Sequence, residues 1–255
     1  MEPVTKIAFP TDEHFPFQDE NARSVALQII SDFDPDEMIV GSDGLDFYAV
    51  SSFDKDPYLK GDPRMQYGID QWTRGQREWI TAAPRARRRF LVGNHEDRLY
   101  RWLSKNPEIA DLEVMKLSSI LRFDPLRIEG EPEYEFSFFD TLLYRHGQYA
   151  RQYSAYSAKA ELEHQRYSIN MMTGHTHRGG TYITRTRRGI VQGNECFCLC
   201  KLESHYNRTK QLVDWAQGTV LATVGPNWLS IEAIPFFTYL GKTVAIWRGK
   251  EYRQS

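Results

Sequence analysis

The sequence predicts one α/β domain that spans residues 1–255. A strand, a helix and a second strand follow one another within the first 41 residues, the pattern of a right-handed crossover between two parallel strands. Short segments rich in histidine and aspartate follow several of the apolar runs. Hydrophobic residues make up 41% and charged residues 26% of the chain, close to the average of globular domains. These observations favour a sheet protein that carries polar groups at its strand ends.

The first crossover unit is predicted from apolar spacing and capping signals. Residues 6–10 are apolar and predict a buried strand. Asp19 is placed to cap a helix, whose apolar residues recur at helical spacing until Asp34 and the proline after it end the helix. Residues 37–40 predict the second strand. The two strands are therefore expected to end side by side.

A third strand is predicted after a polar loop and a helix. Residues 51–62 are rich in Asp, Lys, Pro and Gly and predict a loop. Apolar residues from Ile69 to Ile80 recur at helical spacing, and residues 88–92 predict a strand that runs into Asn94. In open α/β sheets ligands bind outside the carboxyl ends of the strands, so this repeated placement of polar residues indicates a site.

The second half of the chain predicts further helices and a change to hairpins. Residues 134–139 and 142–144 predict a hairpin, and residues 169–172 predict a strand before a glycine. Glycine pairs then separate short predicted strands up to the C-terminal region. Helices are predicted at residues 96–105, 110–122 and 153–167.

Five short segments after these apolar runs hold five of the seven histidines. They are Asp12-Glu13-His14, Ser42-Asp43, Gly93-Asn94-His95-Glu96, Arg145-His146-Gly147 and Gly174-His175-Thr176-His177. Their side chains offer oxygen and imidazole nitrogen, which suit hard to borderline divalent ions. The segments predict the site of a two-metal hydrolase. The remaining histidines, His164 and His205, are predicted on a helix surface and in a loop.

The residue types suggest how two ions would be held. Asp43 is the candidate bridging ligand, because a shared anionic oxygen offsets the repulsion between two cations. Asp12 and His14 lie two residues apart and can reach one ion, while Asn94 offers a neutral oxygen to the other. The shells are completed by His146, His175 and His177.

His95 has no duty as a ligand in this scheme. Beside Asn94 it suits a general acid, or a group that stabilises the transition state near the leaving oxygen. Glu96 is placed to orient it. Asp46 has two interpretations, a cap of a helix or loop and a support for the site.

The charges are unevenly distributed although the formal net charge is only −2. Residues 1–60 hold 13 acidic and 4 basic side chains, whereas residues 145–188 hold 8 basic and 2 acidic ones. The basic stretch predicts a site for an anionic substrate, with an ordinary solvated face as the alternative. Its tyrosines could stack on bases, although helix packing is the favoured interpretation. The tyrosines are Tyr149, Tyr153 and Tyr156, and the candidate substrate-binding arginines are Arg145, Arg151 and Arg178.

The three cysteines, Cys196, Cys198 and Cys200, alternate and would share one face of a strand. Core packing is favoured over a zinc site, which would use wider spacing and a fourth ligand. An odd number argues against a disulfide framework and fits a reducing compartment. The sequence has no membrane-length apolar run and no signal-peptide pattern, so a soluble cytoplasmic protein without a membrane partner is expected. Its oligomeric state is left open.

The order of the five segments resembles the calcineurin-like metallophosphoesterase superfamily, from Asp12 to His177. The resemblance implies a four-layer α/β/β/α sandwich of two mixed β-sheets. It also implies His95 as the catalytic histidine and two divalent ions, with manganese first and iron, zinc, nickel, cobalt or magnesium as alternatives. The implied ligands of one ion are Asp12, His14, Asp43 and His177, and those of the other are Asp43, Asn94, His146 and His175.

One position departs from the pattern of the superfamily. The second motif usually begins Gly-Asp, whereas this chain has Ser42 before Asp43. Metal binding is expected to survive with slight local adjustment. The strings around Asp46 and Glu96 resemble compact bacterial and bacteriophage members, which bears on origin more than on activity.

The predicted function is hydrolysis of phosphate esters by a hydroxide held between the ions. A phosphodiesterase that acts on nucleotides or nucleic acid is favoured, and a phosphomonoesterase or protein phosphatase is the alternative. A non-catalytic interaction protein on the same fold is less favoured, because the ligand set and His95 are intact. Other binuclear hydrolase classes are weaker still, because the His-x-His-x-Asp-His run of metallo-β-lactamases and the N-terminal His-x-His of amidohydrolases are absent from the sequence.

Overall fold

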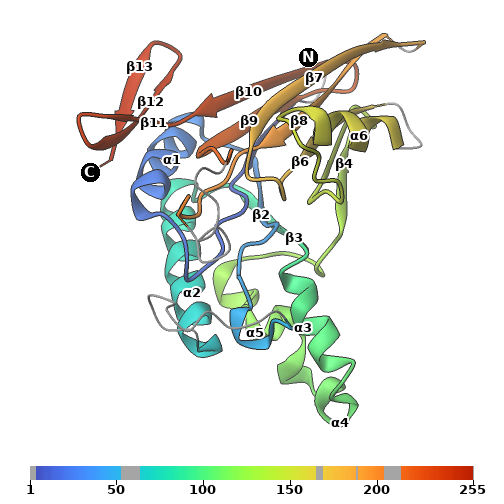
Figure 1. Cartoon of the computed structure of the whole chain (residues 1–255). Helices are drawn as coiled ribbons and strands as arrows, with labels where there is room; N and C mark the ends of the chain where they lie inside the picture. Colours follow the sequence, from blue (N-terminus) through green and yellow to red (C-terminus); the bar gives the residue numbers. More distant parts are fainter. Residues whose placement is uncertain (1–3, 53–63, 165–168, 188, 204–213, 255) are drawn as a thin grey trace.

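The computed structural model describes residues 4–52, 64–164, 169–187, 189–203 and 214–254, and within them two five-stranded mixed sheets and a small third sheet (Figure 1). The first sheet consists of β1 (Thr5–Phe9), β2 (Glu37–Gly41), β3 (Arg87–Leu91), β9 (Gly218–Val224) and β10 (Leu229–Pro235). Their order is β10-β9-β1-β2-β3, with β1, β2 and β3 parallel as expected from the crossover pattern. The carboxyl ends of these three strands therefore meet at one edge.

The second sheet has the order β4-β5-β6-β8-β7. Its strands are β4 (Glu135–Phe138), β5 (Leu142–Arg145), β6 (Asn170–Thr173), β7 (Gly179–Thr186) and β8 (Gly189–Cys196). The predicted hairpin is confirmed as β4 and β5, which pair antiparallel. Strands β5 and β6 are parallel, so their carboxyl ends also lie together.

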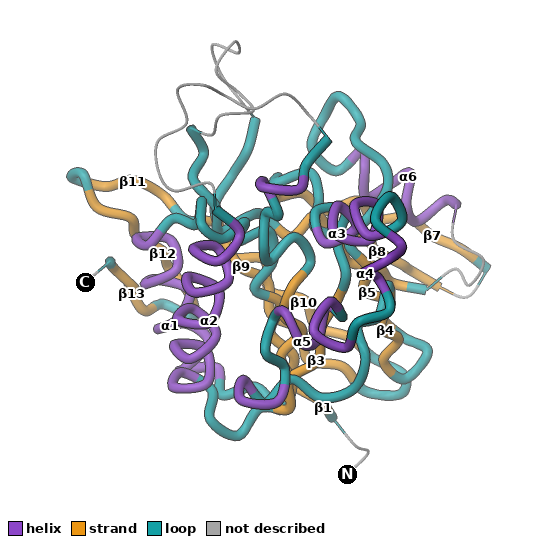
Figure 2. Tube along the Cα trace, turned by 90° about the horizontal axis from the view of Figure 1, so that it is seen from below, coloured by secondary structure: helices purple, strands orange, loops and turns teal. Residues whose placement is uncertain are grey.

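Helices cover the outer faces of both large sheets (Figures 1 and 2). They are α1 (Glu20–Phe33), α2 (Met65–Ala82), α3 (Glu96–Leu103) and α6 (Tyr156–His164). Helices α1 and α2 lie side by side against the first sheet, and α6 lies against the second. The predicted cap of α1 is confirmed, because the carboxylate of Asp19 accepts hydrogen bonds from two backbone amides of the first turn.

Successive side chains of a strand point to opposite faces of its sheet, so one strand contributes to two separate hydrophobic clusters. In β1, Ile7 and Phe9 pack against Phe136 and Tyr144 of the second sheet, whereas Ala8 faces the helices. A separate cluster joins Leu162 of α6 to the outer face of the second sheet. The layers are thus helices, sheet, sheet and helix, and they hold the two sets of strand ends at fixed positions.

The single helix predicted at residues 110–122 is wrong. Four short elements occupy this region, namely α4 (Pro107–Ala110), a 3₁₀ turn (Glu113–Met115), α5 (Leu117–Ile120) and a 3₁₀ turn (Asp124–Leu126). Lys116 is extended between two of these elements, and the carbonyl of Leu121 accepts a hydrogen bond from the indole of Trp72. Tertiary contacts to α2 therefore override the apolar spacing.

The three cysteines are buried and free, which confirms core packing for Cys196 and Cys198, whereas Cys200 lies close enough to His14 and His177 to share an ion with them. Their predicted common strand is wrong in part, because β8 ends at Cys196 and Phe197 has a φ of +63°. This left-handed residue breaks the alternation, so Cys198 and Cys200 follow in irregular backbone.

The C-terminal region forms the third sheet from β11 (Phe237–Tyr239), β12 (Lys242–Trp247) and β13 (Lys250–Arg253). It packs beside α1 (Figure 1). Among the described residues, no helix is long and apolar enough to cross a membrane. Most of the loop predicted at residues 51–62, and the end of the helix predicted at 153–167, lie outside the described residues, as does His205.

Candidate metal centre

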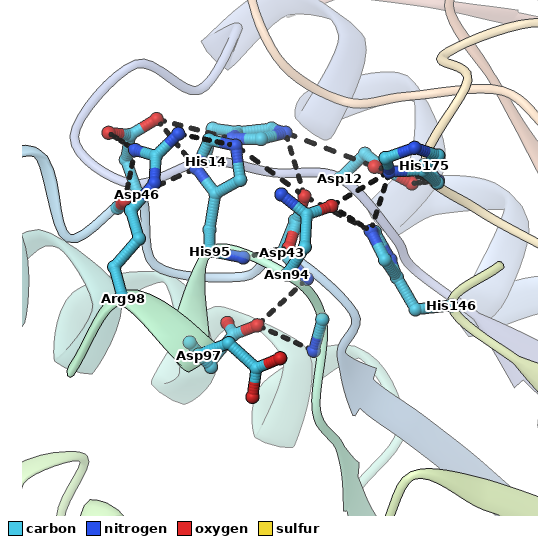
Figure 3. A network of polar contacts seen from close by, with 12 residues as sticks. Asp12, His14, Asp43, Asp46, Asn94, His95, Asp97, Arg98, His146 and His175 are labelled. Atoms are coloured by element: carbon cyan, nitrogen blue, oxygen red, sulfur yellow. Dashed lines mark hydrogen bonds and ion pairs between the residues drawn. The ribbon is translucent and has the colours of Figure 1, made fainter. Parts of the chain in front are cut away.

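The candidate centre lies where five strands end, three in the first sheet and two in the second. Each strand delivers a loop to the same place between the sheets (Figure 3). The loops after β1, β2, β3, β5 and β6 contribute, respectively, Asp12 and His14, Asp43, Asn94 and His95, His146, and His175 and His177. The sequence prediction that these segments converge is confirmed by their contacts.

Backbone hydrogen bonds join the loops. The amide of Asp12 donates to the carbonyl of Ser42 at 2.9 Å, and the amide of His14 donates to the carbonyl of Asp43 at 2.9 Å. The loop after β6 of the second sheet is joined to the loop after β1 by a hydrogen bond that the amide of His175 donates to Oδ1 of Asp12, at 3.1 Å. The side chains are thus positioned by the strands rather than by free loops.

A first group of donor atoms surrounds Asp12. Nε2 of His177 lies 3.2 Å from Oδ1 of Asp12 and 2.9 Å from Nε2 of His14. Nε2 of His14 lies 3.9 Å from Oδ2 of Asp43. All four side chains are buried. Such spacings are what the ligands of one ion span when each lies about 2.0–2.2 Å from it.

A second group surrounds Asn94. Its Oδ1 lies 2.8 Å from Nε2 of His146 and 2.7 Å from Nδ1 of His175. Nε2 of His146 lies 3.2 Å from Oδ2 of Asp43. One carboxylate oxygen of Asp43 therefore faces both groups, while its Oδ1 accepts the backbone amide of His95 at 2.8 Å.

The donor chemistry fits divalent ions. Buried carboxylate, amide and imidazole groups suit manganese, iron or zinc, and the His and Asp side chains of both groups lie close enough to hold an ion. The placement of Asp43 is the one that a bridging ligand requires.

One histidine in each group of donors has a raised pKa. Burial opposes protonation, but hydrogen bonds with Asp12 and Asp46 raise the pKa of His14 to about 10. In the same way burial is outweighed by the charge of Asp43, which raises the pKa of His146 to about 9. A bound ion would have to displace these protons.

The pKa values of the other two histidines, His175 and His177, are lowered instead. Burial lowers the pKa of His177, and burial together with the charge of His146 lowers that of His175. Each group thus pairs an imidazole whose pKa is raised with one whose pKa is lowered, and their ring nitrogens lie 2.9 and 3.2 Å apart. Burial alone would raise the pKa of Asp12, but His14 and His177 hold it well below its usual range.

The segments of the centre are strained. Six non-glycine residues have a φ between +51° and +70°, a region that side chains rarely adopt. Such strain concentrates at functional sites, where the surrounding structure enforces it. The residues are Asp12, His14, Ser42, Asp43, His175 and His177.

Two glycines allow the close approach of the loops. A Cβ atom at residue 174 would lie 2.4 Å from Oδ2 of Asp12, and one at residue 93 would lie 2.2 Å from Oδ1 of Asp43. Neither carboxylate could keep its place beside a larger residue.

His95 lies at the edge of the two groups with its ring held on both sides (Figure 3). Its Nδ1 lies 3.1 Å from Oδ2 of Asp46, and its Nε2 lies 3.0 Å from Nη2 of Arg98 and 3.7 Å from Oδ2 of Asp43. Arg98 also donates to the carboxylate and carbonyl of Asp46, at 3.0 and 2.9 Å. Of the two roles predicted for Asp46, a cap of a helix or loop and a support for the site, the contacts with His95 and Arg98 agree with the second.

Glu96 does not play the part expected of it. Its buried carboxylate accepts hydrogen bonds from the backbone amides of Gly93, Asp43 and Leu45 at 2.8–3.2 Å. Burial and the charge of Asp43 raise its pKa to about 7. Glu96 joins the loops after β2 and β3, and the carboxylate against the His95 ring is that of Asp46.

Two of the three candidate substrate-binding arginines form ion pairs with acidic residues. Nη2 of Arg145 lies 2.6 Å from Oε2 of Glu161, and Nε of Arg178 lies 2.7 Å from Oδ2 of Asp214. Arg151 is exposed. Two basic residues of the charged stretch, at positions 166 and 188, lie outside the described residues.

The three tyrosines of the basic stretch differ in their contacts and exposure. Tyr149 packs on the exposed His164, with ring centroids 4.9 Å apart, which confirms His164 as a surface residue of α6. Tyr153 and Tyr156 are 59% and 57% exposed, so the favoured packing role is wrong for them.

Several residues of the centre were missed by the sequence interpretation. Glu13 is fully buried and accepts hydrogen bonds from Arg23 and Trp79, at 2.8 and 3.1 Å, which fixes the loop after β1. Sγ of Cys200 lies 3.8 Å from Nδ1 of His177. The position of Glu13 between two candidate ligands could have singled it out, whereas Cys200 is one of the three cysteines for which core packing was favoured over a metal site.

Comparison with known proteins gives one relative. No family model matches the chain. The chain is similar to the Gene 54 protein of Mycobacterium phage D29, with 23% identity over 258 residues. The alignment covers 90% of this chain and 93% of the phage protein. The likeness relates the chain to a bacteriophage protein along most of its length.

Proposed function

We propose that this protein is a binuclear metal-dependent phosphoesterase. The observation that carries the proposal is the position of Oδ2 of Asp43, 3.2 Å from Nε2 of His146 and 3.9 Å from Nε2 of His14. One anionic oxygen that faces two separate groups of donors is what a pair of cations needs. The proposed ligands are the seven of the sequence interpretation, Asp12, His14, Asp43, Asn94, His146, His175 and His177.

Two divalent ions held there would supply an activated water and offset charge on the phosphate. Manganese is the proposed ion, with the other first-row ions and magnesium as alternatives. The protein contributes the fixed spacing of the ligands, and the buried surroundings strengthen their electrostatic interactions.

His95 is the proposed catalytic residue. Asp46 holds Nδ1, and Nε2 points to the edge of the two groups, where a leaving oxygen would depart. In the structure Nη2 of Arg98 donates to Nε2, so the imidazole would act as an acid only when Nε2 carries the proton and turns from Arg98 to that oxygen, a contribution of about 10²–10⁴ in rate. The two carboxylate supports, Asp46 and Glu96, keep His95 and the loop that carries it in place.

The rim of the centre favours a diester in a nucleotide or nucleic acid. Tyr153 and Tyr156 are exposed with ring centroids 5.6 Å apart, and the exposed Arg151 holds its guanidinium over the ring of Tyr149. Arg178, which follows the ligand segment, donates to the carbonyl of Arg151 at 2.5 Å and so fixes this rim to the centre. Exposed aromatic rings with an arginine suit unpaired bases.

The arrangement of layers supports the same proposal. Two mixed sheets packed face to face between helices agree with the four-layer sandwich that the resemblance implies. The likeness to a mycobacteriophage protein fits a role in a phage-infected bacterial cell.

A substrate panel tests this proposal. Metal-free protein is reconstituted with Mn²⁺ and assayed on bis-p-nitrophenyl phosphate, p-nitrophenyl phosphate and single-stranded DNA, with His95→Ala as the control. Faster hydrolysis of the diester and of DNA is expected. Preference for the monoester would replace the diester assignment by a phosphomonoesterase, and equal rates in His95→Ala would contradict the catalytic assignment.

A further inference from the structure

Ser42 lies within the candidate centre although no ligand role was assigned to it. It is 1% exposed and has a φ of +54°, a backbone conformation that favours glycine. Its Oγ lies 2.9 Å from Nδ1 of His146 and 2.9 Å from Oγ1 of Thr11. A serine held in a strained conformation, with its hydroxyl between two polar partners, indicates a role for that hydroxyl.

The chemistry of the partners sets the direction of each hydrogen bond. Oγ1 of Thr11 lies 2.7 Å from Oδ2 of Asp12, a carboxylate oxygen that only accepts. The carbonyl of Ser42, at 3.2 Å, is the other acceptor within reach of Thr11, but the carboxylate of Asp12 is closer and charged. Thr11 therefore gives its single hydroxyl proton to Asp12 and accepts one from the hydroxyl of Ser42. The lone pair of Ser42 is then free to accept the Nδ1 proton of His146.

This order of protons fixes the ring of His146. With Nδ1 held as a donor to Ser42, the ring directs Nε2 toward Oδ1 of Asn94 at 2.8 Å and Oδ2 of Asp43 at 3.2 Å, the two oxygens that would share an ion with it. Hydrogen bonds at the far nitrogen orient a metal-binding histidine and keep its other nitrogen free to bind. The same chain of hydroxyls ends on Asp12, which belongs to the other group of donors.

We propose that Ser42 is a positioning residue that orients His146 for one ion and joins it, through Thr11, to the Asp12 ligand of the other. The proposal rests on the proposed function in so far as the two groups hold ions. It explains why a serine occupies a left-handed position where glycine would be free of strain, since glycine would leave Nδ1 of His146 without this acceptor.

Metal titration of the full-length protein tests the proposal. Metal-free wild type, Ser42→Gly, Ser42→Ala and Thr11→Val are titrated with Mn²⁺ by calorimetry, and thermal unfolding of each metal-free protein is recorded. We expect Ser42→Gly to weaken binding of one ion by about 10–100-fold, the usual effect of removing an outer partner of a metal-binding histidine. The same change should raise the unfolding midpoint, because glycine relieves the strain.

The opposite signs of these two effects separate positioning from general stability. Asp140→Gly is the matched control, because Asp140 has a φ of +51° on the exposed β4–β5 turn. It should raise the midpoint and leave metal affinity unchanged. Ser42→Ala should weaken binding without the gain in stability, and it decides the question if Ser42→Gly does not fold.

A spectroscopic readout is available in the metal-free protein. The Nδ1 proton of His146 should give a slowly exchanging, downfield proton signal that Ser42→Ala abolishes. Wild-type affinity in both Ser42 variants, or an unchanged His146 signal, would overturn the proposal. Wild-type protein that binds two ions without hydrolysing any ester would contradict the proposed function alone, because the titration would still decide the role of Ser42.

Discussion

Oδ2 of Asp46 lies 3.1 Å from Nδ1 of His95 and orients the only histidine of the five segments that faces the centre without a ligand duty. The same oxygen lies 3.3 Å from Nδ1 of His14. A single buried carboxylate thus supports a proposed ligand and the proposed catalytic group, which couples metal binding to catalysis.

Asp46→Asn should therefore have two effects. The variant loses the charge that orients both rings, so we expect about 10–100-fold weaker Mn²⁺ binding and a comparable fall in kcat. Calorimetry and steady-state kinetics at saturating Mn²⁺ measure the two effects separately. A fall in only one of them would show that the carboxylate does not serve both histidines.

Arg98→Ala should affect catalysis alone. Arg98 contacts Nε2 of His95 and donates to the carbonyl and Oδ1 of Asp46, whereas it is Oδ2 of Asp46 that faces His14. We expect kcat to fall about 10-fold or more while two equivalents of Mn²⁺ still bind, in contrast to Asp46→Asn. Added guanidinium should restore part of the rate. Weaker metal binding in this variant would contradict the separation of roles.

Metal binding should release protons and strengthen as the pH rises. The pKa values of about 10 for His14 and about 9 for His146 lie above the ordinary value of 6.5, so an ion displaces protons at neutral pH. Calorimetry in buffers of different ionisation enthalpy should give a release of about one to two protons at pH 7, and apparent affinity should increase from pH 6 to 9. Affinity that is independent of pH would contradict these pKa values.

The stability of the metal-free protein should change in the opposite sense. His14 and His146 bind protons more tightly in the folded protein than in the unfolded chain. Their protonation therefore contributes fully to the free energy of unfolding below pH 6.5, and this contribution is lost as the pH rises through 9–10. The unfolding midpoint should fall across this range without metal, and bound Mn²⁺ should reduce the fall. A midpoint that rises between pH 7 and 10 would sink this account.

Glu13→Gln should destabilise the fold. The change removes the one fully buried carboxylate that Arg23 contacts, at 2.8 Å, while the partly exposed Glu78 and Glu20 remain as its partners. We expect a loss of about 1–3 kcal/mol in the free energy of unfolding, measured with urea, because a hydrogen bond to a charged group is lost inside the protein. The matched control is Glu113→Gln, which breaks an exposed pair with Lys116 and should cost under about 1 kcal/mol.

The sequence carried enough information for the strand ends but not for the surroundings of the site. Asp12 and Asp43 could be placed together because a crossover between parallel strands fixes which ends are neighbours. His146 and His175 follow parallel strands of the second sheet, which the motif order also indicated. These positions depend on local patterns, which a sequence displays directly.

Contacts between distant segments could not be predicted in this way. Arg98 reaches His95 from the next helical turn, and Ser42 reaches His146 across the two sheets, so each partner depends on the packed fold. The helix predicted at residues 110–122 failed for the same reason, since the indole of Trp72 binds a carbonyl there. Glu96 was placed in the centre correctly, but its backbone partners were decided by the loop geometry.

The most direct test of the central claim is the rate of bis-p-nitrophenyl phosphate hydrolysis as Mn²⁺ is added to metal-free protein. The account predicts a rate that rises until two equivalents are bound, disappears with a chelator and is lost in both Asp43→Asn and His95→Ala. Hydrolysis no faster than that of the metal-free protein, or a rate unchanged in Asp43→Asn, would contradict it.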